Sequence, residues 1–167
     1  VDGKLVVQQG IIAGCAGGMY DNIAEAAAIL SGGDVGCGPF SLSVYPPSIP
    51  VNLELMQNGV QQALLEAGVL FKPCFCGPCF GAGDVPANNA LSVRHTTRNF
   101  PNREGSKPGD GQLSGVLLMD ARSIAATARN HGVVTSAAEV DYPAPAPVRR
   151  TFDGGVYGRR VYFGYGK

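Results

Sequence analysis

The sequence has few charged residues and no excess of either sign. Only 16% of its 167 residues are Asp, Glu, Lys or Arg, against about 25% in typical globular domains. Part of the surface is therefore expected to face a partner domain rather than water. Lys and Arg together number 13, and so do Asp and Glu. A chain without a basic excess is not expected to bind nucleic acid or an anionic membrane.

The sequence also lacks an apolar run long enough to span a membrane. It has no N-terminal segment in which basic, apolar and small residues follow one another as in a secretion signal. Its length predicts one domain with a substantial core. The first residue is Val rather than Met, so we expect that the chain was processed or cut from a longer protein.

The five cysteines are an odd number, so they cannot all pair in disulfides within one chain. Three of them, Cys74, Cys76 and Cys79, lie in one short segment rich in Gly and Pro. Such clustering favours a metal or reactive site in a reducing compartment, which we expect to be the cytoplasm.

Apolar segments alternate with segments of helical periodicity along residues 1–140. Strands are expected over 4–13 (with a break at Gly10), 40–45, 69–71, 90–97 and 115–120. Helices are expected over 22–30, 48–67 and 121–132, capped by Asp21, Ser48 and Asp120. Strands that alternate with helices predict an α/β domain with a mainly parallel sheet.

The composition changes after Val140. Residues 141–150, "DYPAPAPVRR", are typical of a stiff linker, and the tail after them is expected to form a hairpin around Asp153, Gly154 and Gly155. The sequence therefore predicts a domain over 1–140, followed by a linker and C-terminal tail over 141–167.

The pair Cys76 and Cys79, spaced C-x-x-C, allows three kinds of site. It can be a redox-active disulfide, although residues 81–84 are a poor start for the helix that normally follows such a pair. It can bind zinc, if Cys15, Cys37 or Cys74 completes the ligand set. It can also hold an iron–sulfur cluster.

Cys15 favours the third kind of site. It follows the first expected strand in a Gly-rich loop that leads into a helix, and Cys76 also follows a strand. Loops at the carboxyl ends of parallel strands gather in one crevice. Cys15, Cys76 and Cys79 can therefore converge although they lie far apart in the sequence.

Three segments in order resemble the aconitase superfamily, which includes isopropylmalate isomerase and homoaconitase. "CFCGPCFGAGD" (74–84) is similar to its C-G-P-C-h-G signature, and "GCAGGMYDNIAEAAAIL" (14–30) to the segment with its first cluster cysteine. "TTRNFPNREG" (96–105) resembles its S-x-N-R-N-F-x-G-R-x-G segment. The resemblance runs from about Ile11 to about Val140, and it implies a three-layer α/β/α domain.

The resemblance implies a [4Fe-4S] cluster held by three cysteines, here Cys15, Cys76 and Cys79. The fourth iron of such a cluster binds substrate and acts as a Lewis acid. Arg98 and Arg103 match the two arginines of the family motif, whose planar guanidinium groups suit di- and tricarboxylate substrates. Thr97 stands where the family has Asn and can still donate one hydrogen bond. Without the resemblance, salt bridges within a loop would be the preferred role of both arginines.

The sequence departs from the family in two ways. Ala16, Gly17 and Gly18 replace polar residues after the first cysteine, which indicates a divergent member; the backbone N–H groups of Gly17 and Gly18 can partly replace the lost hydrogen bonds. Family enzymes are also several hundred residues long, and no general base is identifiable here. We therefore expect the cluster-bearing third domain of a hydro-lyase (a hydratase) that acts on a hydroxy di- or tricarboxylate with other domains of the same enzyme.

Two different functions stay open beside this one, and several residues are expected to have no part in the site. The chain could be a non-catalytic zinc-binding or regulatory module, or a thiol redox protein. Cys37 and Cys74 match no ligand position and are expected to be small, partly buried thiols. Asp84 is expected to be a solvated turn residue.

Overall fold

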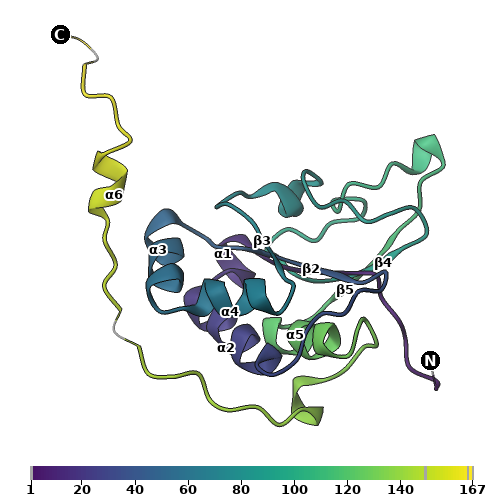
Figure 1. The fold of residues 1–167 in the computed structure, drawn as a ribbon. Coiled ribbons are helices and arrows are strands. Elements are labelled where there is room, and N and C mark those ends of the chain that lie inside the picture. The colour runs from purple at the N-terminus through teal and green to yellow at the C-terminus, as the bar shows by residue number, and fades with distance from the viewer. Residues whose placement is uncertain (1, 149, 165, 167) are drawn as a thin grey trace.

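A parallel β-sheet forms the centre of the molecule (Figure 1). The computed structural model describes residues 2–148, 150–164 and 166, and within them the sheet has five strands in the order β3-β2-β1-β4-β5. The strands are β1 (Gln9–Ala13), β2 (Ser41–Tyr45), β3 (Leu70–Phe71), β4 (Leu91–His95) and β5 (Gly115–Leu118). All four pairings are parallel, so the predicted α/β class is confirmed.

The first strand, β1, lies in the middle of the sheet. Gln9 pairs with Ser41 of β2 on one side and with Ser92 of β4 on the other. Ile11 and Ile12 are fully buried, because β1 is covered on both faces, as strands of parallel sheets usually are. The predicted break at Gly10 was wrong: β1 continues through this residue, where a side chain would approach Phe40 and Ile124 to about 3 Å.

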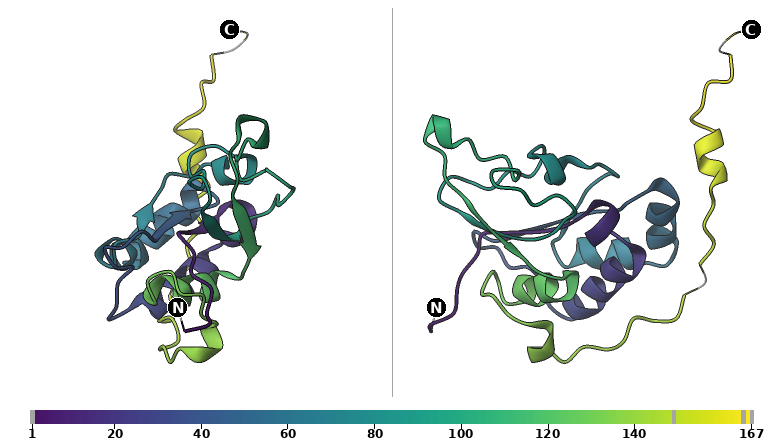
Figure 2. Two further views of the ribbon diagram at one scale, coloured as in Figure 1. Left: turned by 90° about the vertical axis from the view of Figure 1, so that its right-hand side faces the viewer. Right: turned by 180° about the vertical axis from the view of Figure 1, so that it is seen from behind.

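Helices cover one face of the sheet, and irregular segments cover the other (Figures 1 and 2). The helices of the main body are α1 (Gly14–Gly17), α2 (Tyr20–Leu30), α3 (Ile49–Gln57), α4 (Val60–Glu66) and α5 (Ala121–Arg129). α2, α4 and α5 lie on the same face, where the large hydrophobic core forms. The opposite face carries the long connections β3–β4 and β4–β5, which include the 3₁₀ helices η1 (Gly77–Phe80) and η2 (Pro108–Asp110).

This division follows from the strand order. From β1 the chain steps outward to β2 and β3, and it then returns across the sheet to β4 and β5 on the other side of β1. Right-handed connections in opposite directions must cross opposite faces. The direction reverses between β1 and β4, and the carboxyl ends of strands at such a point are where open α/β sheets usually bind ligands.

Helix starts were predicted with mixed success. Ser48 accepts a hydrogen bond from the Val51 N–H, and Asp120 accepts from the N–H groups of Arg122 and Ser123, so both caps are confirmed. Asp21 is not a cap, because α2 begins one residue earlier and its first turn contains Asp21. The helix expected over 48–67 is two helices, separated by Asn58 and Gly59.

The segment after Val140 leaves the domain and returns along the helices. Pro143 to Ala146, together with Val148, border a hollow with residues of α2 and α4. The structure continues to a short helix, α6 (Gly155–Gly158), beside α3. The predicted hairpin was wrong, since Asp153 to Gly155 lead into this helix. The boundary at residue 140 stays a prediction.

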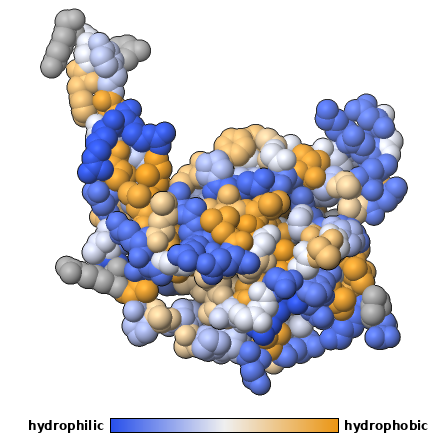
Figure 3. Space-filling model, viewed as in Figure 1, coloured by the Kyte–Doolittle hydropathy of each residue, from blue (hydrophilic) through white to orange (hydrophobic). Residues whose placement is uncertain are grey.

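The arm that carries α6 projects from the body, and hydrophobic and hydrophilic residues lie side by side on it (Figure 3). Phe152, Tyr162 and Phe163 on this arm are exposed, whereas Val156 of α6 is buried. Among the described residues, no helix is both long enough and apolar enough to cross a membrane.

Candidate metal centre and substrate pocket

Two of the predicted site residues come into contact just beyond the carboxyl ends of β1 and β4. Cys15 lies in α1 directly after β1, and Thr97 follows β4. The Cys15 Sγ and Thr97 Oγ1 atoms are 3.0 Å apart and share a hydrogen bond. This pair was not anticipated, because the sequence analysis placed Thr97 inside the strand 90–97 and expected Cys15 to meet Cys76 and Cys79.

Gly17 makes this contact possible. A Cβ atom at position 17 would lie 2.0 Å from the backbone oxygen of His95, at the end of β4. Only glycine can sit there without moving α1 away from β4. The role we expected for the Gly18 N–H is excluded, because this group donates to the Gly14 oxygen at 3.0 Å.

The segment after β3 brings the other two cysteines to the same place. Cys79 lies in η1 and is buried, and its N–H donates to the Cys76 oxygen at 3.1 Å. The Cys79 sulfur also lies close to Gly14, the neighbour of Cys15, since a Cβ atom at position 14 would be 3.8 Å from it. Cys79 therefore approaches the start of α1 from the face of the sheet opposite the helices.

The groups that shift the pKa of the Cys76 thiol are further evidence that these residues lie close together. Burial raises this pKa, the thiols of Cys79 and Cys15 raise it further, and the Arg98 guanidinium lowers it. Each of these groups must be near Cys76 to act on it. Three predicted ligands and one predicted substrate-binding arginine thus share one neighbourhood.

The three thiols are not arranged around a single point. Within residues 2–148, 150–164 and 166, no three His, Cys, Asp or Glu side chains form a group that could hold one metal ion. Ligands of a cluster bind different iron atoms and need not reach a common point. Cys37 is exposed, and burial raises the pKa of the partly buried Cys74.

A buried arginine that the sequence analysis did not single out holds the cysteine segment on the sheet. Arg94 is only 2% exposed. Its guanidinium donates to the backbone oxygens of Pro78 and Asp84, each at 3.0 Å. The signal was a charged residue inside an apolar strand, and the strand pattern alone did not show where its side chain points.

Asp84 anchors the far end of the cysteine segment and is not a solvated turn residue. Its carboxylate accepts a hydrogen bond from the Tyr45 hydroxyl at 2.5 Å and lies 4.0 Å from the Lys72 ammonium. Burial, together with the Asp84 carboxylate, raises the pKa of Tyr45, so this hydroxyl stays protonated and can donate. The expectation failed because Tyr45, at the end of β2, comes close to Asp84 only in the folded chain.

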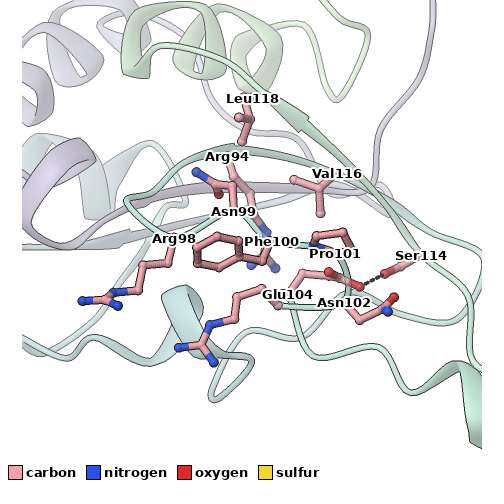
Figure 4. A pocket seen from close by; sticks show the side chains of 11 residues that line it. Arg94, Arg98, Asn99, Phe100, Pro101, Asn102, Glu104, Ser114, Val116 and Leu118 are labelled. Atoms are coloured by element: carbon pink, nitrogen blue, oxygen red, sulfur yellow. Dashed lines mark hydrogen bonds between the residues drawn. The ribbon is translucent and has the colours of Figure 1, made fainter.

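A pocket of about 410 Å³ opens next to this centre (Figure 4). Arg98, Arg103 and Asn99 line it with polar groups, and Phe100, Val116 and Leu118 add apolar surface. The Nε of Arg103 is buried and has no hydrogen-bond partner within the described residues. This atom is a donor that a bound carboxylate could use.

Glu104 lines the pocket and holds two segments of its wall together. It accepts hydrogen bonds from the hydroxyls of Ser106 and Ser114, the second at 2.9 Å (Figure 4). Burial raises the pKa of Glu104, but these bonds outweigh burial and hold its pKa below the ordinary value. Glu104 is therefore a carboxylate at neutral pH, and it restrains the loop that carries Arg103.

Comparison with known proteins shows which protein family has this sequence pattern. Residues 2–126 match the sequence pattern of the aconitase family, which is described as aconitate hydratase. The chain belongs to the aconitase family. The match covers the strands, the three cysteines and the pocket, and it ends within α5.

Several family members with assigned names are similar over this region. The 3-isopropylmalate dehydratase large subunit of Nitratidesulfovibrio vulgaris (strain DP4) is 32% identical over 125 residues, which are 72% of this chain and 29% of that protein. Large subunit 1 of Methanopyrus kandleri is 33% identical over 121 residues, covering 72% and 29%. Large subunit 2 of Pyrococcus furiosus is 34% identical over 113 residues, covering 65% and 28%. The chain thus spans less than a third of the length of these relatives.

Proposed function

We propose that this chain is the cluster-bearing third domain of a divergent hydro-lyase of the aconitase family. In this proposal Cys15, Cys76 and Cys79 hold a [4Fe-4S] cluster. The observation that carries it is the meeting of Cys15 with Thr97 at 3.0 Å, in the neighbourhood where Cys76, Cys79 and Arg98 interact. A crevice at a topological switch point is also where open α/β sheets bind ligands.

The donor set fits a cluster of this kind. Three thiols from two segments lie beyond the carboxyl ends of strands, with mutual effects on the pKa of Cys76, and one of them, Cys79, is buried. When bound, a cluster with three protein thiolates supplies an iron with an open position, which acts as a Lewis acid on a hydroxyl group and carboxylate.

The arginines give the pocket its preference for carboxylates. Arg98 lies close enough to Cys76 to lower its pKa, so a carboxylate on Arg98 would also be close to the proposed cluster. Arg103 offers a buried Nε without a partner in the described part of the chain. We propose that both bind the carboxylates of a small hydroxy di- or tricarboxylate, and that Thr97 orients Cys15 or donates to the substrate.

We assign no general base to this chain. Dehydration needs a group that removes a proton from the carbon next to the one that bears the hydroxyl, and we propose that another domain of the same protein supplies it. By itself this chain is then inactive, although it retains the cluster. We also propose that the protein works in the cytoplasm, where thiol ligands stay reduced.

The test is the metal content of the full protein, purified and reconstituted with ferrous iron and sulfide without oxygen. We expect a brown protein with iron and sulfide in equal amounts. Cys15→Ser, Cys76→Ser and Cys79→Ser should each lose most of this content, whereas Cys37→Ser, at an exposed cysteine outside the site, should keep it.

Two results would replace the proposal. Stoichiometric zinc without sulfide would identify a zinc module. A reversible disulfide between Cys76 and Cys79 in a protein that takes up no metal would identify a thiol redox protein.

A further inference from the structure

Arg94 combines deep burial with an unusual set of partners. It forms four hydrogen bonds: Nε donates to Ser92 Oγ, Nη1 to the Pro78 oxygen, and Nη2 to Gln9 Oε1 and to the Asp84 backbone oxygen. All four acceptors are neutral oxygens. Four of the five N–H groups of the guanidinium are therefore satisfied, but its positive charge is not matched by any of these partners.

A buried charge without a counter-charge is costly. In the part of the chain that the structure describes, none of the ion pairs within 4.0 Å includes Arg94. Burial lowers the pKa of Arg94, whereas Glu104, Asp84 and Cys79 act from a longer distance to raise it. The Cys79 thiol is the only one of these three groups that belongs to the proposed metal centre.

We propose that Arg94 is a positioning residue for the metal centre, which fixes the Cys79 ligand and balances the negative charge of the bound thiolate cluster. This inference rests on the proposed function. A [4Fe-4S] cluster with three thiolates is an anion, and beside Cys79 it would add a negative charge near the guanidinium, on which the carboxylates of Glu104 and Asp84 act only from a longer distance.

The hydrogen bonds show how the positioning works. The Pro78 oxygen belongs to the residue directly before Cys79, and the Asp84 oxygen lies where the segment leaves the metal centre. Gln9 and Ser92 hold the other side of the guanidinium on β1 and β4. Arg94 thus connects the cysteine segment to the two central strands β1 and β4.

The first experiment uses the full protein without metal and measures how fast iodoacetamide alkylates each cysteine, by mass spectrometry. Cys79 is 1% exposed, so it should react slowly in the wild type. In Arg94→Met the segment loses its anchor, and alkylation of Cys79 should become at least about tenfold faster, because loss of hydrogen bonds to a charged group shifts the opening equilibrium by about this factor.

A matched control separates positioning from general stability. Arg129 also donates to two backbone oxygens, those of Ile29 at 2.5 Å and Ser31 at 3.2 Å, but on the helical side of the domain. Arg129→Met should change the alkylation of Cys79 less than twofold. If Cys79 stays as protected in Arg94→Met as in the wild type, or if Arg129→Met exposes it equally, Arg94 does not position this ligand.

The second experiment tests the charge in the reconstituted protein. Reduction by one electron from dithionite makes the cluster more negative, so removing a nearby positive charge should disfavour it. The midpoint potential of Arg94→Gln should therefore be more negative than that of the wild type, and Arg94→Lys should lie between them. Equal potentials in Gln and Lys variants would overturn the charge balance.

The two experiments separate the inference from the proposed function. If the wild type takes up no cluster, the proposed function fails and so does the charge balance, while the alkylation rates still decide whether Arg94 anchors the segment. If the cluster forms but neither the alkylation rate of Cys79 nor the midpoint potential depends on Arg94, only the inference fails.

Discussion

The two faces of the sheet are stabilised in different ways. On the helical face, apolar side chains of α2, α4 and α5 such as Ile23, Leu64 and Ile124 are fully buried against the strands. On the opposite face, the buried hydrophobic cluster formed by the described residues consists of Ile11, Ala13 and Tyr45. Hydrogen bonds of buried polar residues hold the segments together there, among them those of Arg94, Glu104 and Ser106.

The two faces therefore have different roles, and we call the face that carries the long β3–β4 and β4–β5 connections the loop face. A face packed from apolar side chains tolerates exchange of one hydrophobic residue for another of similar volume. A face built from buried polar groups depends on every partner, because an unsatisfied buried group is costly. The helical face therefore supplies stability, and the loop face fixes the geometry of the proposed metal centre.

The largest effect on stability should come from the helical face. Ile124 is fully buried in α5, so Ile124→Ala should lower the free energy of unfolding by about 2–5 kcal/mol. Chemical denaturation of the apo-protein measures this loss. Cluster content per folded molecule should not change; a loss of cluster from folded protein would contradict the division of the two faces.

A smaller loss of stability but a complete loss of the site is expected for Gly17→Ala. The new Cβ would collide with the His95 oxygen at 2.0 Å, and overpacking of this kind costs about 1–3 kcal/mol. Because α1 must move, Cys15 leaves Thr97, and reconstitution should fail. Gly38→Ala is the control, since nothing lies within 4 Å of a Cβ atom there. Normal cluster content in Gly17→Ala would show that the close approach is not needed.

Acid should weaken the loop face through Glu104. Its pKa is held below the ordinary value by its hydrogen bonds, against the effect of burial, so the folded state binds a proton less readily than the unfolded chain. The stabilisation is fully present above pH about 4.3, the pKa of an unperturbed Glu, and it is lost as the pH falls through the lower pKa of the folded state. Glu104→Gln removes this contribution.

The measurement is the free energy of unfolding of the apo-protein between pH 2 and 7. The wild type should lose stability on the acid side, and Glu104→Gln should show a shallower dependence. Identical slopes for the two proteins would mean that Glu104 does not carry the effect.

The smallest effect concerns the helix starts of the helical face. Asp120 caps α5 through two backbone N–H groups, so Asp120→Ala should cost about 1 kcal/mol. Asp21 accepts no capping bond and only pairs with Arg150 at the surface, so Asp21→Ala should cost less, at most about 0.5–1 kcal/mol. Thermal denaturation of both variants compares them, and an equal or larger loss for Asp21→Ala would reverse the assignment.

The same division explains what could be predicted from the sequence. Strands and helices of the helical face follow from periodicity, so the α/β class, the parallel sheet and the caps at Ser48 and Asp120 were found. Gly59 was missed as a helix break because the apolar stripe continues across it. The meeting of Cys15 with Thr97 was not anticipated, because Thr97 was expected to belong to the strand 90–97; the sequence predicted only that Cys15, Cys76 and Cys79 converge.

Most contacts on the face opposite the helices could not be predicted from the sequence. Arg94, Asp84 and Glu104 depend on partners far away in the sequence, such as Pro78, Tyr45 and Ser114, and no local pattern signals these bonds. The clustering of the cysteines and their places after strand ends predicted a metal or reactive site, and the resemblance to a known family implied a [4Fe-4S] cluster there.

The most direct test of the proposed metal centre is Mössbauer spectroscopy of the full protein reconstituted with ⁵⁷Fe. Three cysteine ligands predict that one iron of the cluster differs from the other three, and that only its signal shifts when a hydroxy dicarboxylate is added. Four equivalent irons that ignore the ligand, or a signal unchanged in Cys15→Ser, would contradict a centre built from Cys15, Cys76 and Cys79.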